Sequence, residues 1–312
     1  MRWTRLPETP NAPGFGGAFV GTSGDLLLCG GGSNFPDKAA WDGGVKVWHD
    51  EVFSLASTRS KKWASLGKLP RPCGYGVSVS IRQGLLMIGG ADSHRHYADC
   101  YTLSVEEGEL KVRPFPFLPR PLAYATGALV GSKVIVAGGT ERPDATAASS
   151  SAFAIDLANL NAGWKELPLC AGSGRMLAQS AGTKDTFFLF GGVALSPGAK
   201  GVEREFLSDC HAFTLGKEWR RLSALPRPVA GAPTPGTYEF QGNTLYLHSR
   251  GFAFSDKREQ PQLLRLRFNG DRIGELASTQ PGQGGAVRLE RLALGVNFRS
   301  TVLTTNDNID II

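Results

Sequence analysis

The sequence has no long apolar run. No stretch of its 312 residues approaches the roughly 18 uninterrupted apolar residues that a helix needs to cross a bilayer, so we expect no transmembrane helix and no membrane association. Residues 1–7 also lack the apolar segment of a secretory signal peptide. We therefore expect a cytoplasmic protein, or a periplasmic one if a signal peptide has been removed.

Cysteine is scarce as well. The five cysteines include no C-x-x-C pair, and their odd number does not suit a fully paired disulfide framework. Cys29, Cys100 and Cys210 fall within expected strands, where a thiol packs as a small apolar group. The sequence therefore predicts free thiols in a reducing compartment.

The chain carries a net charge of +6, but it has no run of basic residues. Scattered lysines and arginines give no reason to expect a nucleic-acid partner, and a small acidic ligand or simple solubility explains them as well. His94 and His96 lie two residues apart with no third histidine or cysteine nearby, so no metal site is predicted. No glycine-rich phosphate loop and no G-x-S-x-G string is present.

Glycine, in contrast, is abundant and recurs in one pattern. Four short apolar runs end in two glycines, at residues 27–31, 85–90, 134–139 and 187–192. The pairs return about every 50 residues, which is the spacing of Kelch-type blades in a β-propeller. Glycine suits the point where a strand must turn away from a crowded centre, because it adopts positive φ at little cost.

Each repeat predicts four strands. A first strand of small residues is expected at 16–21, 75–81, 125–131 and 178–183, followed by the strand that ends in glycines. A third strand is expected at 50–53, 99–101, 152–155 and 209–213. The outer strand carries the string W-x-x-L at Trp63, Trp164 and Trp219, and we expect these tryptophans to pack between neighbouring blades.

The W-x-x-L string occurs once more, at Trp3, where the other three strands of a repeat do not precede it. Because the last repeat lacks an outer strand, we predict that this N-terminal segment completes it and closes the ring, which removes two sheet edges. The fifth repeat is degenerate, with residues 248–251 in place of the glycine pair. We predict an all-β fold: one six-bladed Kelch-type β-propeller domain over residues 1–312, divergent from about residue 235.

One face of such a propeller collects the long loops. They follow the second strands, at 34–49, 92–97, 140–151, 193–206 and 250–261. Arginines at the blade junctions join them, and three lie in Leu-Pro-Arg-Pro strings, namely Arg71, Arg120 and Arg227. These arginines can cap blade edges or grip a carboxylate with both nitrogens. In the dense polar string at 94–97, His96 suits a proton shuttle, although a solvated loop histidine is the alternative.

Several loop strings are similar to those of the circularly permuted branch of the Kelch-propeller sialic-acid mutarotases, the N-acetylneuraminate epimerases. They are G-G-S-N-F-P-D at 31–37, W-D-G-G-V-K-V-W-H at 41–49, R-H-Y-A-D at 95–99, G-G-T-E-R-P-D-A-T at 138–146, G-R-M-L-A at 174–178, G-G-V at 191–193 and R-E-F-L-S-D at 204–209. The resemblance covers residues 1 to about 235. It implies a six-bladed propeller that interconverts the anomers of sialic acid without a cofactor.

Mutarotation needs a base for the anomeric hydroxyl, an acid for the ring oxygen and cations for the carboxylate of the sugar. We expect His96 and Glu141 to transfer the protons, and Arg175 and Arg95 to hold the carboxylate, with Arg175 as the main anchor. The full set of expected substrate-binding residues is Asn34, Arg95, Tyr97 and Arg175.

Two other functions stay open. The G-E-x-x-P-G-x-R string of the family has no counterpart here, which favours a non-catalytic propeller that binds a glycan or a protein on the same face. A copper sugar oxidase also uses a Kelch propeller, but it needs a set of tyrosine and histidine ligands that these histidines do not offer.

Overall fold

The computed structural model describes residues 3–10, 14–56, 60, 62–170, 172–199, 201–225 and 228–231, followed by the backbone of seven further strands. Nearly every described element is a strand, and the exceptions are the short 3-10 helices η1 (Ala40–Asp42) and η2 (Leu160–Ala162). No helix in the described residues is long and apolar enough to span a membrane.

Four antiparallel sheets repeat the same order of four strands, and we call them blades 1 to 4. Blade 1 contains β2 (Phe19–Ser23), β3 (Leu26–Gly30), β6 (Glu51–Leu55) and β7 (Ala64–Lys68), and blade 2 contains β8 (Val77–Ile81), β9 (Gly84–Ala91), β10 (His96–Glu106) and β11 (Glu109–Phe115). Blade 3 contains β12 (Thr126–Val130), β13 (Lys133–Ala137), β14 (Ala152–Asp156) and β15 (Lys165–Leu167), and blade 4 contains β16 (Gln179–Gly182), β17 (Thr186–Phe190), β20 (Cys210–Thr214) and β21 (Trp219–Leu222). The four predicted repeats are therefore confirmed.

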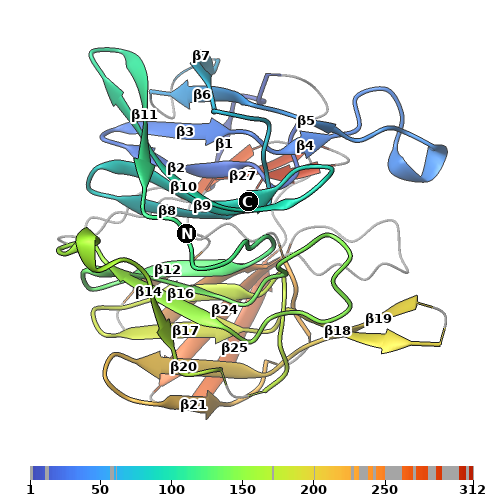
Figure 1. Cartoon of the computed structure of the whole chain (residues 1–312), viewed down its shortest axis with the longest axis vertical. Coiled ribbons are helices and arrows are strands. Elements are labelled where there is room, and N and C mark those ends of the chain that lie inside the picture. Colours follow the sequence, from blue (N-terminus) through green and yellow to red (C-terminus); the bar gives the residue numbers. More distant parts are fainter. Residues whose placement is uncertain are drawn as a thin grey trace.

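The first strands of consecutive blades contact one another, β2 with β8, β8 with β12 and β12 with β16. They therefore share a common centre, which is the arrangement of a β-propeller (Figure 1). A fifth sheet joins β22 (Tyr238–Gln241), β23 (Thr244–Ser249), β24 (Gln262–Asn269) and β25 (Arg272–Thr279). The ring of six blades remains a prediction.

The N-terminal strand β1 (Trp3–Leu6) pairs antiparallel with β26 (Ala286–Leu289). β27 (Val302–Asn306) and β28 (Ile309–Ile311) complete that sheet, in the order β1-β26-β27-β28. The N-terminal strand thus lies in one sheet with the last strands of the chain, as the ring-closure prediction requires, but the order within the sheet differs from the prediction. β1 neighbours β26, the first of the three C-terminal strands, whereas the outer strand of blades 1 to 4 neighbours the third strand in chain order.

Three indole hydrogen bonds between blades support the same closure. Trp164 Nε1 donates to the Pro116 carbonyl at 2.8 Å and Trp219 Nε1 to the Pro168 carbonyl at 2.8 Å, and each proline follows the outer strand of the preceding blade. Trp63 of blade 1 donates to the carbonyl of Pro7 at 3.0 Å, and Pro7 directly follows β1. β1 therefore plays the part of an outer strand, and the predicted packing of these tryptophans between blades is confirmed.

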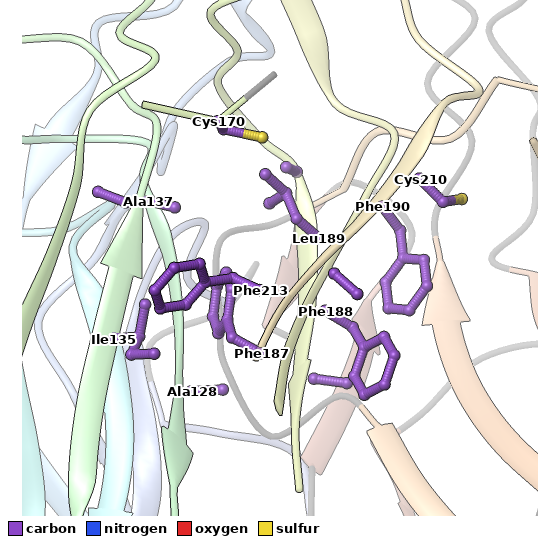
Figure 2. Close-up of a cluster of buried hydrophobic side chains, with 14 of the residues drawn as sticks. Ala128, Ile135, Ala137, Cys170, Phe187, Phe188, Leu189, Phe190, Cys210 and Phe213 are labelled. Atoms are coloured by element: carbon purple, nitrogen blue, oxygen red, sulfur yellow. The ribbon is translucent and has the colours of Figure 1, made fainter. Parts of the chain in front are cut away.

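A large core cluster fills the space between blades 3 and 4 (Figure 2). Phe187 and Leu189 point from β17 toward Ile135 of blade 3, and Phe188 and Phe190 point the opposite way. These four side chains are at most 3% exposed. Burying each phenylalanine stabilises the fold by about 1.5–3 kcal/mol, so the loops stand on a rigid base.

All five cysteines belong to the described residues, and each is buried with no disulfide to another. Cys29 lies in β3, Cys100 in β10 and Cys210 at the start of β20, as predicted. Burial raises the pKa of each of these three thiols to about 12. These thiols therefore stay protonated at neutral pH and serve the core.

The glycine pairs allow one blade to approach the next closely. Gly89 has a φ of 61°, and a Cβ at this position would overlap the Leu122 carbonyl of the following junction. The amide of the second glycine, Gly90, donates to that same carbonyl at 2.8 Å. The repeated pairs thus fix where the loops begin.

The loops after the second strands leave the molecule on one side, which we call the loop face. In blade 1, β4 (Ser33–Asn34) pairs with β5 (Val47–Trp48), and in blade 4, β18 (Val193–Gly198) pairs with β19 (Gly201–Phe206). Figure 1 shows both hairpins projecting from the same side of the sheets.

Candidate functional site

A chain of backbone hydrogen bonds links the blades just before their first strands. Gly17, Tyr75, Tyr124 and Leu177 have φ values of 66°, 58°, 59° and 55°. The amide of Tyr75 donates to the Gly17 carbonyl at 2.7 Å, Tyr124 to Tyr75 at 2.8 Å, Leu177 to Tyr124 at 2.9 Å, and Gly231 to Leu177 at 3.0 Å. A left-handed conformation costs a residue other than glycine about 1–3 kcal/mol, and such strain gathers at functional sites. This series of hydrogen bonds brings Tyr75 and Tyr124 to the centre of the loop face.

These tyrosines belong to what we call the aromatic cluster, formed by Trp48, Tyr75, His96 and Tyr124 together with Lys46. The ring centroids of Tyr75 and Tyr124 are 5.0 Å apart, Trp48 meets Tyr75 edge-on at 5.6 Å, and His96 meets Tyr124 edge-on at 5.9 Å. The Lys46 ammonium lies 4.3 Å from the Tyr75 centroid and 4.7 Å from that of Trp48. Ring faces with a few convergent polar groups are typical of small-molecule sites.

His96, one of the two predicted proton-transfer residues, is buried beside Tyr124. Its Nδ1 lies 2.9 Å from the Thr140 carbonyl, and because a carbonyl only accepts, Nδ1 carries the proton. Burial lowers the pKa of His96 and outweighs the opposing hydrogen bond to Thr140. Near neutral pH the ring is therefore uncharged, with a basic lone pair on Nε2.

Asn34 lies on β4 next to the aromatic cluster and is 1% exposed. Its Oδ1 accepts a hydrogen bond from His49 Nε2 at 2.8 Å, whereas its buried Nδ2 has no hydrogen-bond partner in the described part of the chain. The neighbouring residue, Ser33, shares a hydrogen bond of 3.1 Å with the Tyr75 hydroxyl. Leaving a buried donor unpaired costs about 1–3 kcal/mol, so Asn34 is a reasonable place for a ligand or an ordered water to bind.

Arg95 and Tyr97 form a neighbouring group around Asp92. The Asp92 carboxylate accepts from the Tyr97 hydroxyl and from the amides of His94 at 2.7 Å and Arg95 at 2.9 Å. Burial favours the neutral acid, but these three hydrogen bonds outweigh it and lower the pKa of Asp92. The exposed Arg95 guanidinium lies 5.3 Å from the Tyr97 centroid. The Tyr97 hydroxyl thus already donates within the protein, whereas Arg95 remains accessible.

Arg175 does not stand where we predicted it. Its side chain is 2% exposed and forms what we call the buried charge cluster with Asp209 and His211. Nη1 and Nη2 of Arg175 donate to the two Asp209 oxygens at 2.8 and 2.7 Å, and Nη1 also donates to the Gly191 carbonyl at 2.9 Å. Asp209 already occupies the guanidinium, and this geometry argues against the predicted role of Arg175 as the main carboxylate anchor.

The other two members of the buried charge cluster also set the pKa of Asp209. Burial favours the neutral acid, but hydrogen bonds from His211 at 2.6 Å and from Arg175 outweigh it and hold the pKa of Asp209 well below its usual range. The backbone at Gly172 covers the cluster, since a Cβ there would lie 3.2 Å from both Arg175 Nη2 and Asp209 Oδ2.

The register of the blades explains why Arg175 points inward. In blades 2 to 4 the amide of the second glycine of each pair donates to the carbonyl of one junction residue that follows the blade, and Gly139 donates to Arg175 at 2.8 Å. In blade 1 the donor is Gly32, the residue after the pair. The equivalent residues in the other blades are Cys73, Leu122 and Val229, all buried. Arg175 thus replaces an apolar core residue, and only a carboxylate beside it makes this possible.

Glu141, the other predicted proton-transfer residue, is exposed. Its carboxylate pairs with Arg120 at 3.3 Å, and Arg120 also reaches Glu166 at 3.2 Å. Glu141 directly follows Thr140, which places it on the loop that holds His96. The same loop lines a hollow of about 310 Å³, formed by Glu141, Arg142 and residues 145–149. This volume is at the lower end of the range for small-molecule pockets.

The described residues contain no group of three histidine, cysteine, aspartate or glutamate side chains placed to hold a metal ion. Arg71 pairs with Asp99 at 3.0 Å and stacks on Tyr97, which fits the reading of the junction arginines as caps of blade edges. Arg227 lies outside the described residues.

Sequence reasoning gave no role to Lys46, Trp48 or the two central tyrosines. One signal was available for the tyrosines: each stands four residues after the arginine of a Leu-Pro-Arg-Pro string, as Tyr75 after Arg71 and Tyr124 after Arg120. Nothing comparable marks Lys46, because its contact with Tyr75 joins two different blades.

Comparison with known proteins finds similarity mainly in the N-terminal third. Residues 2–112 match the family model of N-acetylneuraminate epimerase, which confirms the predicted resemblance over that range. Residues 224–291 match a second model, the second domain of bifunctional transglycosylases, where the structure describes little beyond strand backbone. The circularly permuted branch stays a prediction.

Two curated relatives show the extent of the likeness. The N-acetylneuraminate epimerase of Salmonella enteritidis is 31% identical over 129 residues, which cover 36% of this chain and 33% of that protein. The enzyme of the same name from Haemophilus influenzae is 36% identical over 104 residues, covering 29% and 27%. The aligned regions thus span about a third of the curated relatives.

The fold is shared over a much greater length. The solved structure of YjhT superposes with a TM-score of 0.63 and covers 98% of this chain and 99% of its own, at 16% sequence identity. At that identity the likeness establishes the β-propeller fold and leaves the chemistry to the site.

Proposed function

We propose that the protein is a mutarotase that interconverts the anomers of N-acetylneuraminate by acid–base opening and closing of the sugar ring, without a cofactor. One observation carries the proposal. The match to the N-acetylneuraminate epimerase model, residues 2–112, includes most of the aromatic cluster, with His96 in it, and also Asn34 and Arg95. The region that resembles the epimerases is thus the region that builds this site.

His96 suits the proton transfers. Its neutral ring takes the proton of the anomeric hydroxyl on Nε2 as the bond between the anomeric carbon and the ring oxygen breaks, and the ring oxygen gains a proton. Both oxygens are attached to the same carbon, so one imidazole can take the proton from the first and return it to the second. Closure on the other face of the new carbonyl reverses these steps and gives the other anomer.

The remaining residues position the sugar. Asn34 offers its buried Nδ2 donor, and the rings of Tyr75 and Tyr124 offer apolar faces beside polar tips. Burial raises the pKa of Tyr124 to about 12, so its hydroxyl remains protonated and able to donate. Glu141 is exposed, and its carboxylate already contacts Arg120 within the protein.

An NMR exchange measurement on N-acetylneuraminate, with and without the protein, tests the proposal. We expect the protein to accelerate anomer exchange and His96→Gln to reduce that acceleration about 10²- to 10⁴-fold. Glu141→Gln, on the adjacent loop, should change it less than about tenfold if His96 both takes and returns the proton. Binding without acceleration would contradict a mutarotase and indicate a propeller that only binds the sugar.

A further inference from the structure

The loop face has few cations left for a ligand. Lys46 forms no ion pair with any carboxylate that the structure describes, and its ammonium touches only aromatic rings. The paired cations of this face are Arg71 with Asp99, Arg120 with Glu141 and Glu166, Arg142 with Asp144, and Arg175 with Asp209.

The contact of Lys46 with the rings leaves its hydrogen-bonding capacity unused. A cation over a ring face is held by its charge, with no directed bond from its N–H groups. The lysine ammonium carries three donors and no acceptor. At 4.3 Å from Tyr75 and 4.7 Å from Trp48, the ammonium is therefore located by the rings while its donors remain available.

Lys46 lies in the extended segment 45–48, which we call the Lys46 arm, and the alternation of its side chains sets the direction of Lys46. Side chains alternate along an extended segment, so Lys46 and Trp48 share one side and Val45 and Val47 the other. Val45 is 75% exposed and Val47 is 38% exposed, whereas Lys46 and Trp48 turn toward Tyr75. Two apolar residues in solvent and a lysine directed inward are the reverse of what solubility alone would select.

A tight turn fixes the base of this arm. The Gly44 amide donates to the Ala39 carbonyl at 3.0 Å, and a Cβ on Gly44 would overlap the Lys38 carbonyl. β5 then pairs with β4, placing Trp48 opposite Ser33. Lys46 is thus held between an ordered turn and an ordered strand, in a position set before any ligand arrives.

We propose that Lys46, held against Trp48 and Tyr75, binds the carboxylate of the sugar acid, the role that the sequence analysis gave to Arg175 and Arg95. This inference rests on the proposed function, because it assigns the charged group of that same substrate. Arg95 is also accessible, but it stacks on Tyr97, and Lys46 is the cation that touches a tyrosine at the centre of the loop face. A carboxylate at Lys46 places the adjoining anomeric carbon beside Tyr75, whose ring contacts that of Tyr124.

The test removes in turn the two charges of the proposed contact, the Lys46 ammonium and the carboxylate of the sugar. Calorimetric titrations use N-acetylneuraminate and its neutral methyl ester with the parent protein, Lys46→Met, Lys46→Arg and Lys38→Met. Methionine retains an unbranched apolar side chain over the two rings, and Lys38 is an exposed lysine on the same loop, which makes it the matched control. Circular dichroism and thermal unfolding confirm that each variant is folded.

We expect Lys46→Met to weaken binding of the acid about 10- to 100-fold and to change binding of the ester by less than about threefold. Lys46→Arg should retain most of the affinity, and Lys38→Met should retain all of it. An equal loss for acid and ester, or no loss for the acid in Lys46→Met, would overturn the assignment of Lys46 while leaving the proposed function intact. A parent protein that binds neither compound would overturn the proposed function itself.

Discussion

The aromatic cluster and the buried charge cluster each contain one cation and one histidine, yet they differ in where the donors of the cation are directed. Arg175 directs its guanidinium at Asp209 and at the Gly191 carbonyl, and the backbone at Gly172 covers it. Lys46 lies over two rings and has no carboxylate partner among the described residues. The comparison teaches that a cation near a site is a ligand anchor only if the fold has not already used its donors.

The difference also separates stability from binding. Removing one partner of a buried pair leaves an uncompensated charge, whereas removing a half-exposed lysine over aromatic rings leaves nothing charged behind. We therefore expect changes in the buried charge cluster to act on unfolding, and changes in the aromatic cluster to act on the sugar.

The largest expected effect comes from Asp209→Ala. It leaves the Arg175 guanidinium buried without its carboxylate and should lower the free energy of unfolding by about 3 kcal/mol, measured by urea denaturation. Arg142→Ala is the matched control, because that arginine is 70% exposed in its pair with Asp144, and a change of at most about 0.5 kcal/mol is expected. A loss below about 1 kcal/mol in Asp209→Ala would remove the contrast between the two clusters.

The second effect concerns pH: the free energy of unfolding should fall in two separate steps as the pH is lowered. The folded-state pKa of His96 is lowered by burial, so the unfolded chain binds this proton first, and stability falls as pH drops below about 6.5. The pKa of Asp209 is also lowered, so its contribution is complete above its unfolded pKa of about 3.9 and is lost as pH falls below that value. Each step has a slope of at most about 1.4 kcal/mol per pH unit.

Urea denaturation from pH 8 to pH 3 should show the first step and the onset of the second. His96→Gln should remove only the step near neutral pH, and Asp209→Asn only the acidic one. A parent protein whose stability does not change between pH 7 and pH 5, relative to His96→Gln, would contradict the neutral, buried state of His96.

The smallest expected effect comes from Tyr75→Phe. It removes the hydrogen bond between the tyrosine hydroxyl and Ser33 Oγ but keeps the ring on which Lys46 stands. We expect a loss of about 0.5–1.5 kcal/mol in unfolding free energy and little change in affinity for the sugar acid. Tyr75→Leu, which removes the ring, should weaken sugar binding as well. Equal affinities in the two variants would show that the ring does not hold Lys46 in place.

Much of the fold could be predicted because its signals are local. Glycine pairs, W-x-x-L strings and short turns each depend on a few adjacent residues, and their repetition made the register readable. Even the closure by β1 followed from a W-x-x-L string without a repeat of its own. Its partner strand β26, at Ala286–Leu289, lies in the part of the chain that diverges from about residue 235.

The site was predicted less well because its contacts join residues that lie far apart in the sequence. Arg175 meets Asp209, which lies 34 residues further along the chain, and the sequence shows an arginine in a loop string without showing the direction of its side chain. Lys46 lies in an alternating V-K-V-W string that predicts an ordinary strand, and its partner Tyr75 belongs to blade 2. His96 was predicted correctly as a histidine of this face because polar residues crowd the short string around it, although its burial came only with the fold.

The most direct test of the account is a crystal structure of the protein with N-acetylneuraminate bound. We predict the sugar carboxylate within about 4 Å of the Lys46 ammonium, the sugar ring beside Tyr75 and Tyr124, and the ion pair of Arg175 with Asp209 unchanged. A sugar bound instead in the hollow lined by residues 145–149, or a carboxylate that takes Arg175 away from Asp209, would contradict it.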